Sequence, residues 1–260
     1  MNDQVLKVTS IQSHLAWENV EANLGHFNEK IKSIKEETDI LVLPEMFTTG
    51  FSMESSKHAD ELHGKTLSHM RQWAGEHDCL VMGSAMLKHE DKFYNRLLAV
   101  FPGGNFEIYD KAHLFMIENE PPNYTRGNKK LILQFRGWRV RPLVCYDLRF
   151  PVWCRNKNDY DLLVFVANWP GSRSRIWKTL LMARAIENQC YVVGSNRIGK
   201  DGMKIEYTGD SLFVDPKGNV IEDMKEKDTV STVSFSLNKL TSFREKFPVL
   251  KDADDFTIHR

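Results

Sequence analysis

Three chemically reactive side chains each follow a strand-like apolar run in this sequence. Glu45 ends "LVLPE", Lys111 follows "FEIYD" and Cys145 ends "RPLVC". Each has an ordinary explanation when taken alone: a solvated acid, a surface cation and a small core residue. In sheets covered by helices, however, ligands and catalytic groups gather where strands end. We therefore treat the three residues as one candidate site.

Together, these three residue types can carry out acyl transfer. A nucleophilic cysteine reacts as its thiolate, which a nearby lysine cation favours. A carboxylate can take the thiol proton and later activate a water molecule. The lysine, joined by a backbone N–H, can stabilise the negative oxygen of a tetrahedral intermediate. The pattern predicts a base, an electrostatic stabiliser and a nucleophile without a histidine.

The spacing of the cysteines and histidines does not predict a metal centre. There are four cysteines and nine histidines, with no C-x-x-C, H-x-H or H-E-x-x-H pattern. Four cysteines are also too few for a disulfide framework in a chain of this length. We expect Cys79, Cys154 and Cys190 to be inert and His113 to be a structural hydrogen-bonding residue. No metal and no organic cofactor is expected.

Composition narrows the class of partner. Basic and acidic residues both number 35, which gives no indication of a nucleic-acid partner. No apolar run approaches the roughly 20 residues of a membrane span. The first residues lack the basic and then apolar pattern of a secretory signal. We therefore expect a cytoplasmic protein that binds neither nucleic acid nor membrane.

Strand-like runs alternate with amphipathic helices along the chain, which predicts an α/β fold with sheets covered by helices. Several hairpin signals, such as Pro102-Gly103-Gly104, indicate mixed sheets. No linker or low-complexity segment is present, so residues 1–260 are expected to form one domain with a polar tail from about residue 241. A helix near residues 176–190 has one apolar stripe, interpreted as a packing face: Ile176, Leu180, Ala183, Ile186 and Cys190.

With these residues in these positions, the sequence resembles the nitrilase superfamily, the carbon–nitrogen hydrolases. The segments "LVLPEMF", "YDKAHLF" and "LVCYDLRFP" are similar to its three catalytic motifs, in order and in spacing. The resemblance extends through "VANWP", "ARAIENQCYVVGSNR" and "GDSLFVDPKGNV", and its details look most like the ω-amidase branch. It implies a four-layer α-β-β-α sandwich with two mixed sheets. It also implies a homodimer or higher homo-oligomer, paired through the helical layers.

The resemblance also implies roles for individual residues. Glu45 matches the general base, Lys111 the catalytic lysine and Cys145 the nucleophile. The backbone N–H of Tyr146 completes the oxyanion hole.

A second glutamate usually follows the lysine and helps to orient the triad. Both Glu118 and Glu120 are candidates. We favour Glu120 because it directly precedes "PPNYTRGN", where the motif resumes. The alternative is that Glu120 is a solvated loop acid.

Arg149 is a candidate for substrate binding because it lies four residues after Cys145. If the segment forms a helical turn, both residues fall on one face, and the guanidinium can bind a substrate carboxylate. The alternative is an internal salt bridge with Asp147. Arg173 is a second candidate. Trp169 is either a pocket wall or a core residue.

These expectations combine into an ω-amidase that hydrolyses the terminal amide of dicarboxylic acid monoamides, such as 2-oxoglutaramate, through a cysteine thioester. Rivals within the superfamily are a nitrilase and an N-carbamoyl amino-acid amidohydrolase. Rivals outside it are a Cys–His thiol peptidase and a non-catalytic binding protein on the same scaffold.

Overall fold

Two large mixed sheets lie face to face in the computed structural model, which describes residues 4–259. Residues 1–3 and 260, the ends of the expected domain, lie outside the described residues. The first sheet has the order β15-β1-β2-β4-β5-β6, with β3 pairing beside β4. Its strands are β1 (Val5–Gln12), β2 (Ile40–Val42), β3 (Asp60–Glu61), β4 (Leu80–His89), β5 (Lys92–Val100), β6 (Phe106–Asp110) and β15 (Thr229–Ser236).

The second sheet has the order β14-β13-β10-β9-β8-β7. Its strands are β7 (Leu133–Phe135), β8 (Trp138–Val144), β9 (Leu162–Ala167), β10 (Tyr191–Asn196), β13 (Leu212–Val214) and β14 (Val220–Asp223). The three central strands β8, β9 and β10 are parallel, and the outer strands are antiparallel. A separate hairpin joins β11 (Ile198–Lys200) to β12 (Glu206–Thr208).

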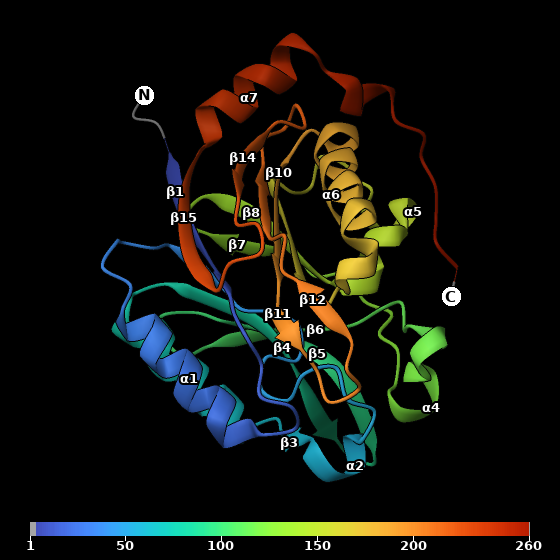
Figure 1. The fold of residues 1–260 in the computed structure, drawn as a ribbon. Helices are drawn as coiled ribbons and strands as arrows, with labels where there is room; N and C mark the ends of the chain where they lie inside the picture. Colours follow the sequence, from blue (N-terminus) through green and yellow to red (C-terminus); the bar gives the residue numbers. More distant parts are fainter. Residues whose placement is uncertain (1–3, 260) are drawn as a thin grey trace.

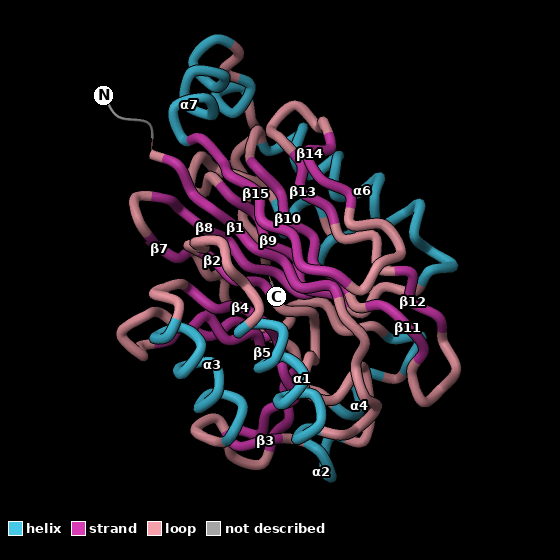
Figure 2. The backbone as a smooth tube through the Cα atoms, turned by 60° about the vertical axis from the view of Figure 1, so that its left-hand side comes forward, coloured by secondary structure: helices cyan, strands magenta, loops and turns pink. Residues whose placement is uncertain are grey.

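Helices cover the outer faces of both sheets, with α1 and α3 on one side and α6 on the other (Figures 1 and 2). The helices are α1 (Val20–Lys32), α2 (Ser55–His58), α3 (Lys65–Glu76), α4 (Glu120–Asn123), α5 (Pro151–Cys154), α6 (Ser174–Asn188) and α7 (Leu237–Lys246). Short 3₁₀ turns are η1 (Met116–Glu118), η2 (Cys145–Arg149), η3 (Gly171–Arg173) and η4 (Val249–Asp252). The predicted four-layer α-β-β-α sandwich is confirmed.

The alternation of side chains along the strands explains this layering. In β2, Ile40 and Val42 join the cluster packed between the two sheets, whereas Leu41 joins the cluster beneath α1 and α3. Both faces of this strand are therefore buried, as its continuous apolar run predicts. The central cluster also includes Leu6 near the beginning of the chain and Leu240 in α7.

The predicted packing face of α6 is wrong. Ile176 and Ile186 are 39% and 55% exposed, and the face that packs inward carries Trp177, Leu181, Arg184, Ala185 and Asn188. The polar members of this face are buried because the protein bonds them. Arg184 donates to the Leu148 carbonyl, and Asn188 accepts from the Asn156 N–H. A pattern that counts only apolar residues therefore selects the wrong side of the helix.

The end of the chain continues the fold beyond residue 241. Helix α7 extends to Lys246, and Ile258 packs against the central cluster. Within residues 4–259, no helix has the length and apolar character needed to cross a membrane.

Candidate active site

The three residues that the sequence analysis grouped come together between the two sheets. Glu45 lies just beyond β2 and Lys111 directly follows β6, both in the first sheet. Cys145 begins η2 at the end of β8, in the second sheet. Its backbone has a φ of 43°, a left-handed conformation that is rare for residues with a side chain and is found at functional turns.

Lys111 forms a fully buried ion cluster with Glu45 and Glu120. Its Nζ lies 2.9 Å from Glu45 Oε1, and 3.0 and 2.9 Å from the two oxygens of Glu120. Burial alone lowers the pKa of a lysine. The carboxylates of Glu120 and Glu45 outweigh burial here and hold the pKa of Lys111 above its usual value. The ammonium is therefore a fixed positive charge in the site.

The structure also separates the two candidate glutamates. Glu120 is fully buried, contacts Lys111 and accepts a hydrogen bond from the Phe115 N–H. Burial raises the pKa of Glu120, and the Lys111 cation opposes this shift. Glu118 is only partly buried and lines the mouth of a pocket. The geometry favours Glu120 as the residue that orients the lysine.

Asn95, on β5, belongs to this cluster and was missed by sequence reasoning. Its Nδ2 donates to Glu45 at 2.7 Å and to Glu120 at 3.2 Å. The hydroxyl of Ser84 donates to Asn95 Oδ1 at 2.9 Å, so the amide is oriented with its NH₂ group toward the two carboxylates. A buried asparagine in the strand "FYNRLLAV" is the signal that could have found it.

Asn168 connects Glu45 to Cys145. Its backbone N–H donates to Glu45 Oε2 at 2.7 Å, and its side chain donates to the Glu45 carbonyl. Its own carbonyl lies 3.9 Å from the Cys145 sulfur. The "VANWP" segment therefore fixes the orientation of the Glu45 carboxylate beside the thiol.

The surroundings of Cys145 favour its neutral thiol form. Burial raises its pKa well above the usual value, and the Glu45 carboxylate raises it further. Lys111 acts in the predicted direction and lowers this pKa, but it does not outweigh the other two causes. A reaction at this sulfur therefore requires removal of the thiol proton, and the Glu45 carboxylate lies beside the thiol.

Asp147 does not form the alternative salt bridge with Arg149 and has a different set of contacts. Its buried carboxylate accepts hydrogen bonds from the Tyr109 hydroxyl (2.7 Å), the His113 N–H (3.0 Å) and the Val144 N–H (3.1 Å). The His113 ring also bonds to it at 2.7 Å and stacks on Phe150. His113 therefore has the structural role that we expected.

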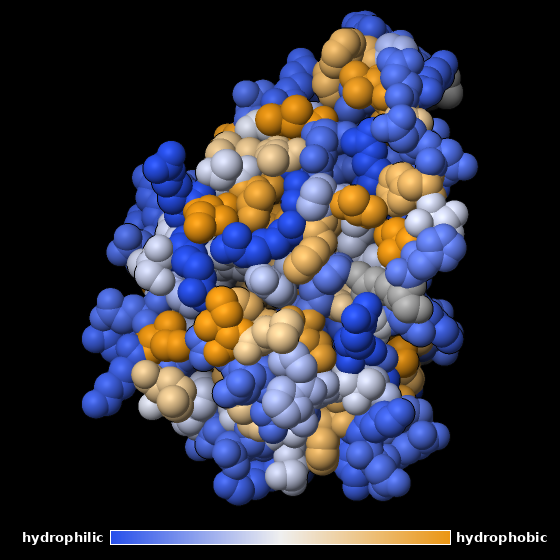
Figure 3. All heavy atoms as spheres, turned by 90° about the vertical axis from the view of Figure 1, so that its right-hand side faces the viewer, coloured by the Kyte–Doolittle hydropathy of each residue, from blue (hydrophilic) through white to orange (hydrophobic). Residues whose placement is uncertain are grey.

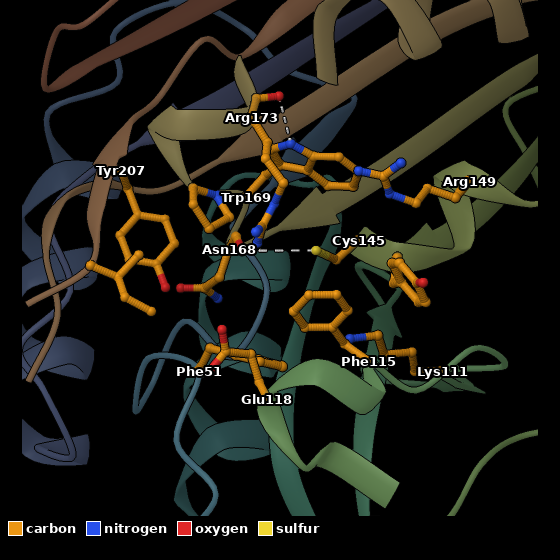
Figure 4. A pocket seen from close by; sticks show the side chains of 13 residues that line it. Phe51, Lys111, Phe115, Glu118, Cys145, Arg149, Asn168, Trp169, Arg173 and Tyr207 are labelled. Carbon is orange, nitrogen blue, oxygen red and sulfur yellow. Dashed lines mark hydrogen bonds between the residues drawn. The ribbon is translucent and has the colours of Figure 1, made fainter. Parts of the chain in front are cut away.

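Cys145 opens into a pocket of about 440 Å³ of empty volume. Figure 4 shows Lys111 and Phe115 below the sulfur and the arginine side chains above it. Phe51, Tyr146 and Tyr207 also line the pocket, and no histidine does so among the described residues 4–259. A Cys–His peptidase requires a histidine at the cysteine, so the geometry does not support that rival.

The three predicted substrate-binding residues all line this pocket. The Arg149 guanidinium lies 5.2 Å from the ring centre of Trp169, and the Arg173 guanidinium lies 5.4 Å from that of Phe115. Within the described part of the chain, neither guanidinium forms an ion pair. Trp169 is 3% exposed and donates to the Arg173 carbonyl. It is therefore both a pocket wall and a buried residue.

The far wall of the pocket comes from the β11–β12 hairpin, which supplies Ile205 and Tyr207. Sequence reasoning missed this hairpin. Its signal is the Asp201-Gly202 pair between two short strand-like runs. Over residues 4–259, no group of three or more histidine, cysteine, aspartate or glutamate side chains is arranged to hold a metal ion.

The chain is similar to known proteins over nearly its whole length. Residues 7–245 match the family described as Carbon-nitrogen hydrolase. The chain is 46% identical to the protein named Omega-amidase YafV from Escherichia coli strain K12, over 97% of this chain and 98% of that protein. It is 31% identical to a 2-oxoglutaramate amidase from Bacillus subtilis strain 168, over 94% of this chain and 96% of that protein.

The fold has a near match among solved structures. The crystal structure of a CN-hydrolase superfamily protein from Xanthomonas campestris superimposes with a TM-score of 0.96 at 38% identity, and each chain is covered completely. By the family match, by near-full-length relatives and by this structure, the chain belongs to the carbon–nitrogen hydrolase family of the nitrilase superfamily.

Proposed function

We propose that this protein is an ω-amidase, which hydrolyses the terminal amide of dicarboxylic acid monoamides such as 2-oxoglutaramate to the acid and ammonia. The observation that carries the proposal is the buried Glu45–Lys111–Glu120 cluster beside Cys145, at the base of a pocket lined by two arginines that form no ion pair within residues 4–259. Full-length similarity to proteins named ω-amidase and 2-oxoglutaramate amidase supports it.

In the first half of the reaction, the Cys145 sulfur attacks the amide carbonyl carbon, and the thiol proton passes to Glu45. Lys111 and the backbone N–H of Tyr146 stabilise the negative oxygen of the tetrahedral intermediate. The carbon–nitrogen bond then breaks, and Glu45 returns the proton to the leaving nitrogen. Ammonia departs and leaves a thioester on Cys145.

In the second half, water attacks the thioester and gives a proton to Glu45. The carbon–sulfur bond breaks, the proton returns to the sulfur and the acid is released. Glu120 and Asn95 keep Lys111 and Glu45 in place throughout, since both are already bonded to them in the resting site. No step uses a metal or an organic cofactor.

Arg149 and Arg173 bind the carboxylate at the other end of the substrate. Each guanidinium lies over an aromatic ring and lacks a carboxylate partner within residues 4–259, so its hydrogen-bond donors are available to a ligand. A substrate with an amide at one end and a carboxylate at the other can then span from Cys145 to the arginines. A simple alkyl nitrile or alkyl amide has no carboxylate and so does not use both ends of the pocket.

The test is a steady-state comparison of 2-oxoglutaramate, an N-carbamoyl amino acid and a ω-cyano carboxylic acid, with released ammonia or product as readout. We expect the ω-amide to have the highest kcat/KM. Preference for the nitrile or the carbamoyl compound would overturn the substrate assignment and leave a different superfamily hydrolase. Lack of turnover with all three compounds would favour a binding protein.

A second measurement tests the nucleophile directly. Rapid acid quenching during turnover should trap an acyl group on the peptide that contains Cys145, detected by mass spectrometry. The Cys145→Ala variant should show neither the adduct nor ammonia release. An acyl group on Cys79, Cys154 or Cys190 contradicts the mechanism.

We also propose that residues 1–260 form a single domain that assembles as a homodimer. The central hydrophobic cluster supports one domain because it joins residues from Leu6 to Leu240. Exposed apolar side chains of the α5 and α6 layer support the dimer: Val152, Ile176 and Ile186. Figure 3 views the molecule from the side that carries these helices, where hydrophobic and hydrophilic residues are interspersed. Light scattering of the wild type and of Ile186→Glu tests this interface.

A cytoplasmic location completes the proposal. All four cysteines are free thiols, as expected in a reducing compartment. Cell fractionation with an antibody against the protein tests the location.

A further inference from the structure

One buried charge next to the pocket has no role in the mechanism above. Arg197 follows β10 and is fully buried. Its guanidinium donates only to backbone carbonyls, those of Leu15 and Lys200 at 3.3 and 3.1 Å and that of Ile198 at 3.4 Å. Its Nη1 has no hydrogen-bond partner among residues 4–259. Buried charges are normally paired because desolvation is costly, so an unpaired buried cation requires an explanation.

The guanidinium of Arg197 lies directly behind two segments that line the pocket. Its Cζ is 4.6 Å from the ring centre of Tyr207. A Cβ at Gly50 would lie 3.3 Å from its Nη1, and Gly50 precedes Phe51. Both Tyr207 and Phe51 line the pocket that contains Cys145. The positive charge is therefore one layer of side chains away from a bound substrate.

Asp201 is a negative charge that acts on both Arg197 and Tyr207. Its Oδ2 accepts a hydrogen bond from the Tyr207 hydroxyl at 2.9 Å, and its Oδ1 accepts from the backbone N–H groups of Met203 and Ile205. Asp201 does not contact Arg197 within ion-pair distance in the described chain. The Asp201 carboxylate therefore neutralises the charge of Arg197 only in part, because the Tyr207 ring lies between the two groups.

We propose that Arg197 is a specificity-determining residue, which selects anionic acyl groups through its electric field without touching them, and that Asp201 limits the strength of this selection. The field acts through packed protein, where charges are screened far less than in water. The inference deepens the proposed function, because it concerns the same carboxylate that Arg149 and Arg173 bind. Those two residues contact the ligand, whereas Arg197 sets the potential of the pocket from behind its wall.

The test compares alkylation of Cys145 by iodoacetate and by iodoacetamide. In both reactions the sulfur forms a bond to the CH₂ carbon, and iodide leaves with the electron pair. The two reagents are similar in size, but only iodoacetate carries a negative charge. The ratio of their rate constants cancels any change in the thiol itself and reports the potential at the pocket. Quantitative mass spectrometry of the Cys145 peptide separates this site from the other cysteines.

Three variants give distinct expectations for the ratio of the iodoacetate rate to the iodoacetamide rate. Arg197→Met should lower it by about tenfold, the factor that corresponds to about 1.4 kcal/mol. Arg197→Lys keeps the positive charge, so its ratio should stay close to that of the wild type. Asp201→Asn removes the compensating charge and should raise the ratio several-fold. If Arg197→Met slows both reagents equally, Arg197 is only a structural residue and the inference is wrong.

The Asp201→Asn variant keeps the test decisive if Arg197→Met does not fold, since asparagine is isosteric and retains an acceptor for the turn. An unchanged ratio in this variant overturns the inference. The alkylation assay needs no turnover, so it is independent of whether the protein hydrolyses an ω-amide. A wild-type enzyme inactive on ω-amides would refute the proposed function, whereas an unchanged alkylation ratio refutes only the role of Arg197.

Steady-state kinetics provides a second readout. Glutaramate and pentanamide share a chain length and an amide, but only glutaramate ends in a carboxylate. Arg197→Met should raise KM for glutaramate and leave that for pentanamide unchanged. Equal changes for both substrates contradict a charge-dependent role.

Discussion

The His113 ring bonds to the Asp147 carboxylate at 2.7 Å, which ties the segment after Lys111 to the turn that carries Cys145. Asp147 also accepts from Tyr109, two residues before the lysine, and from Val144, one residue before the cysteine. One buried carboxylate therefore bonds to segments on both sides of the proposed oxyanion site. Its hydrogen bonds reach β6 of the first sheet and β8 of the second.

Replacing Asp147 with asparagine should lower kcat by about 10- to 100-fold with little change in KM, because an amide cannot accept all four hydrogen bonds and the oxyanion donors shift. The free energy of unfolding should fall by about 1–3 kcal/mol. Kinetics with 2-oxoglutaramate and urea denaturation measure the two effects. Tyr109→Phe is the matched control, since it removes one donor and keeps the carboxylate. An equal loss of kcat in both variants contradicts this positioning role.

The two glutamates after Lys111 should respond differently to the same substitution. Glu120→Gln weakens the buried ion cluster and should reduce kcat/KM by about 100-fold, the scale of one lost electrostatic contact in an active site. Glu118→Gln should stay within a few-fold of the wild type, because Glu118 does not contact Lys111. Ammonia release assays compare the two. The reverse order of effects would identify Glu118 as the supporting residue.

Arg149→Met should raise KM for 2-oxoglutaramate by about 10- to 100-fold, the scale of one charged hydrogen bond. Arg149→Lys should recover only part of this, since an ammonium cannot replace a planar fork. Arg173→Met should act in the same direction. The control is pentanamide, for which none of the variants should change KM. A loss of kcat with both substrates would instead indicate that the pocket has collapsed.

Stability should decrease as the pH rises above about 8.5, where thiols of the unfolded chain ionise. Burial raises the pKa of Cys79 and of Cys154 to about 12. Between these pH values the folded state retains protons that the unfolded state has lost. The free energy of unfolding therefore falls, by about 1.4 kcal/mol per pH unit for each thiol.

Urea denaturation from pH 7.5 to pH 10 measures this slope. In Cys79→Ala the free energy of unfolding should fall less steeply with pH, because one of the contributing thiols is missing. The variant should nevertheless be less stable at every pH. Equal slopes in the two proteins would show that Cys79 does not contribute.

The sequence was most informative where chemistry and local pattern agreed. Glu45, Lys111 and Cys145 follow strands with clear apolar runs, so their positions could be inferred before their contacts were known. The choice of Glu120 over Glu118 depended on the resemblance. The catalytic roles of all four residues stay predictions until the variants are measured.

Residues whose role depends on three-dimensional contacts could not be found in this way. Asn95 lies within a strand, and its amide gains a role at the site only because the fold brings Glu45 and Glu120 within hydrogen-bond distance. Arg184 and Asn188 pack inward on α6 because distant segments satisfy their polar groups. Hydrophobic periodicity contains no information about such partners, so it placed the buried face of α6 on the wrong side.

The division of the site between two sheets has a consequence for folding. Glu45 and Lys111 follow strands of the first sheet, and Cys145 and Asn168 follow strands of the second. A refolding intermediate with only one sheet formed, or with both formed but apart, contains every catalytic residue and still lacks an active site. The return of ammonia release during refolding therefore reports the docking of the two sheets, whereas far-UV circular dichroism reports only the formation of secondary structure.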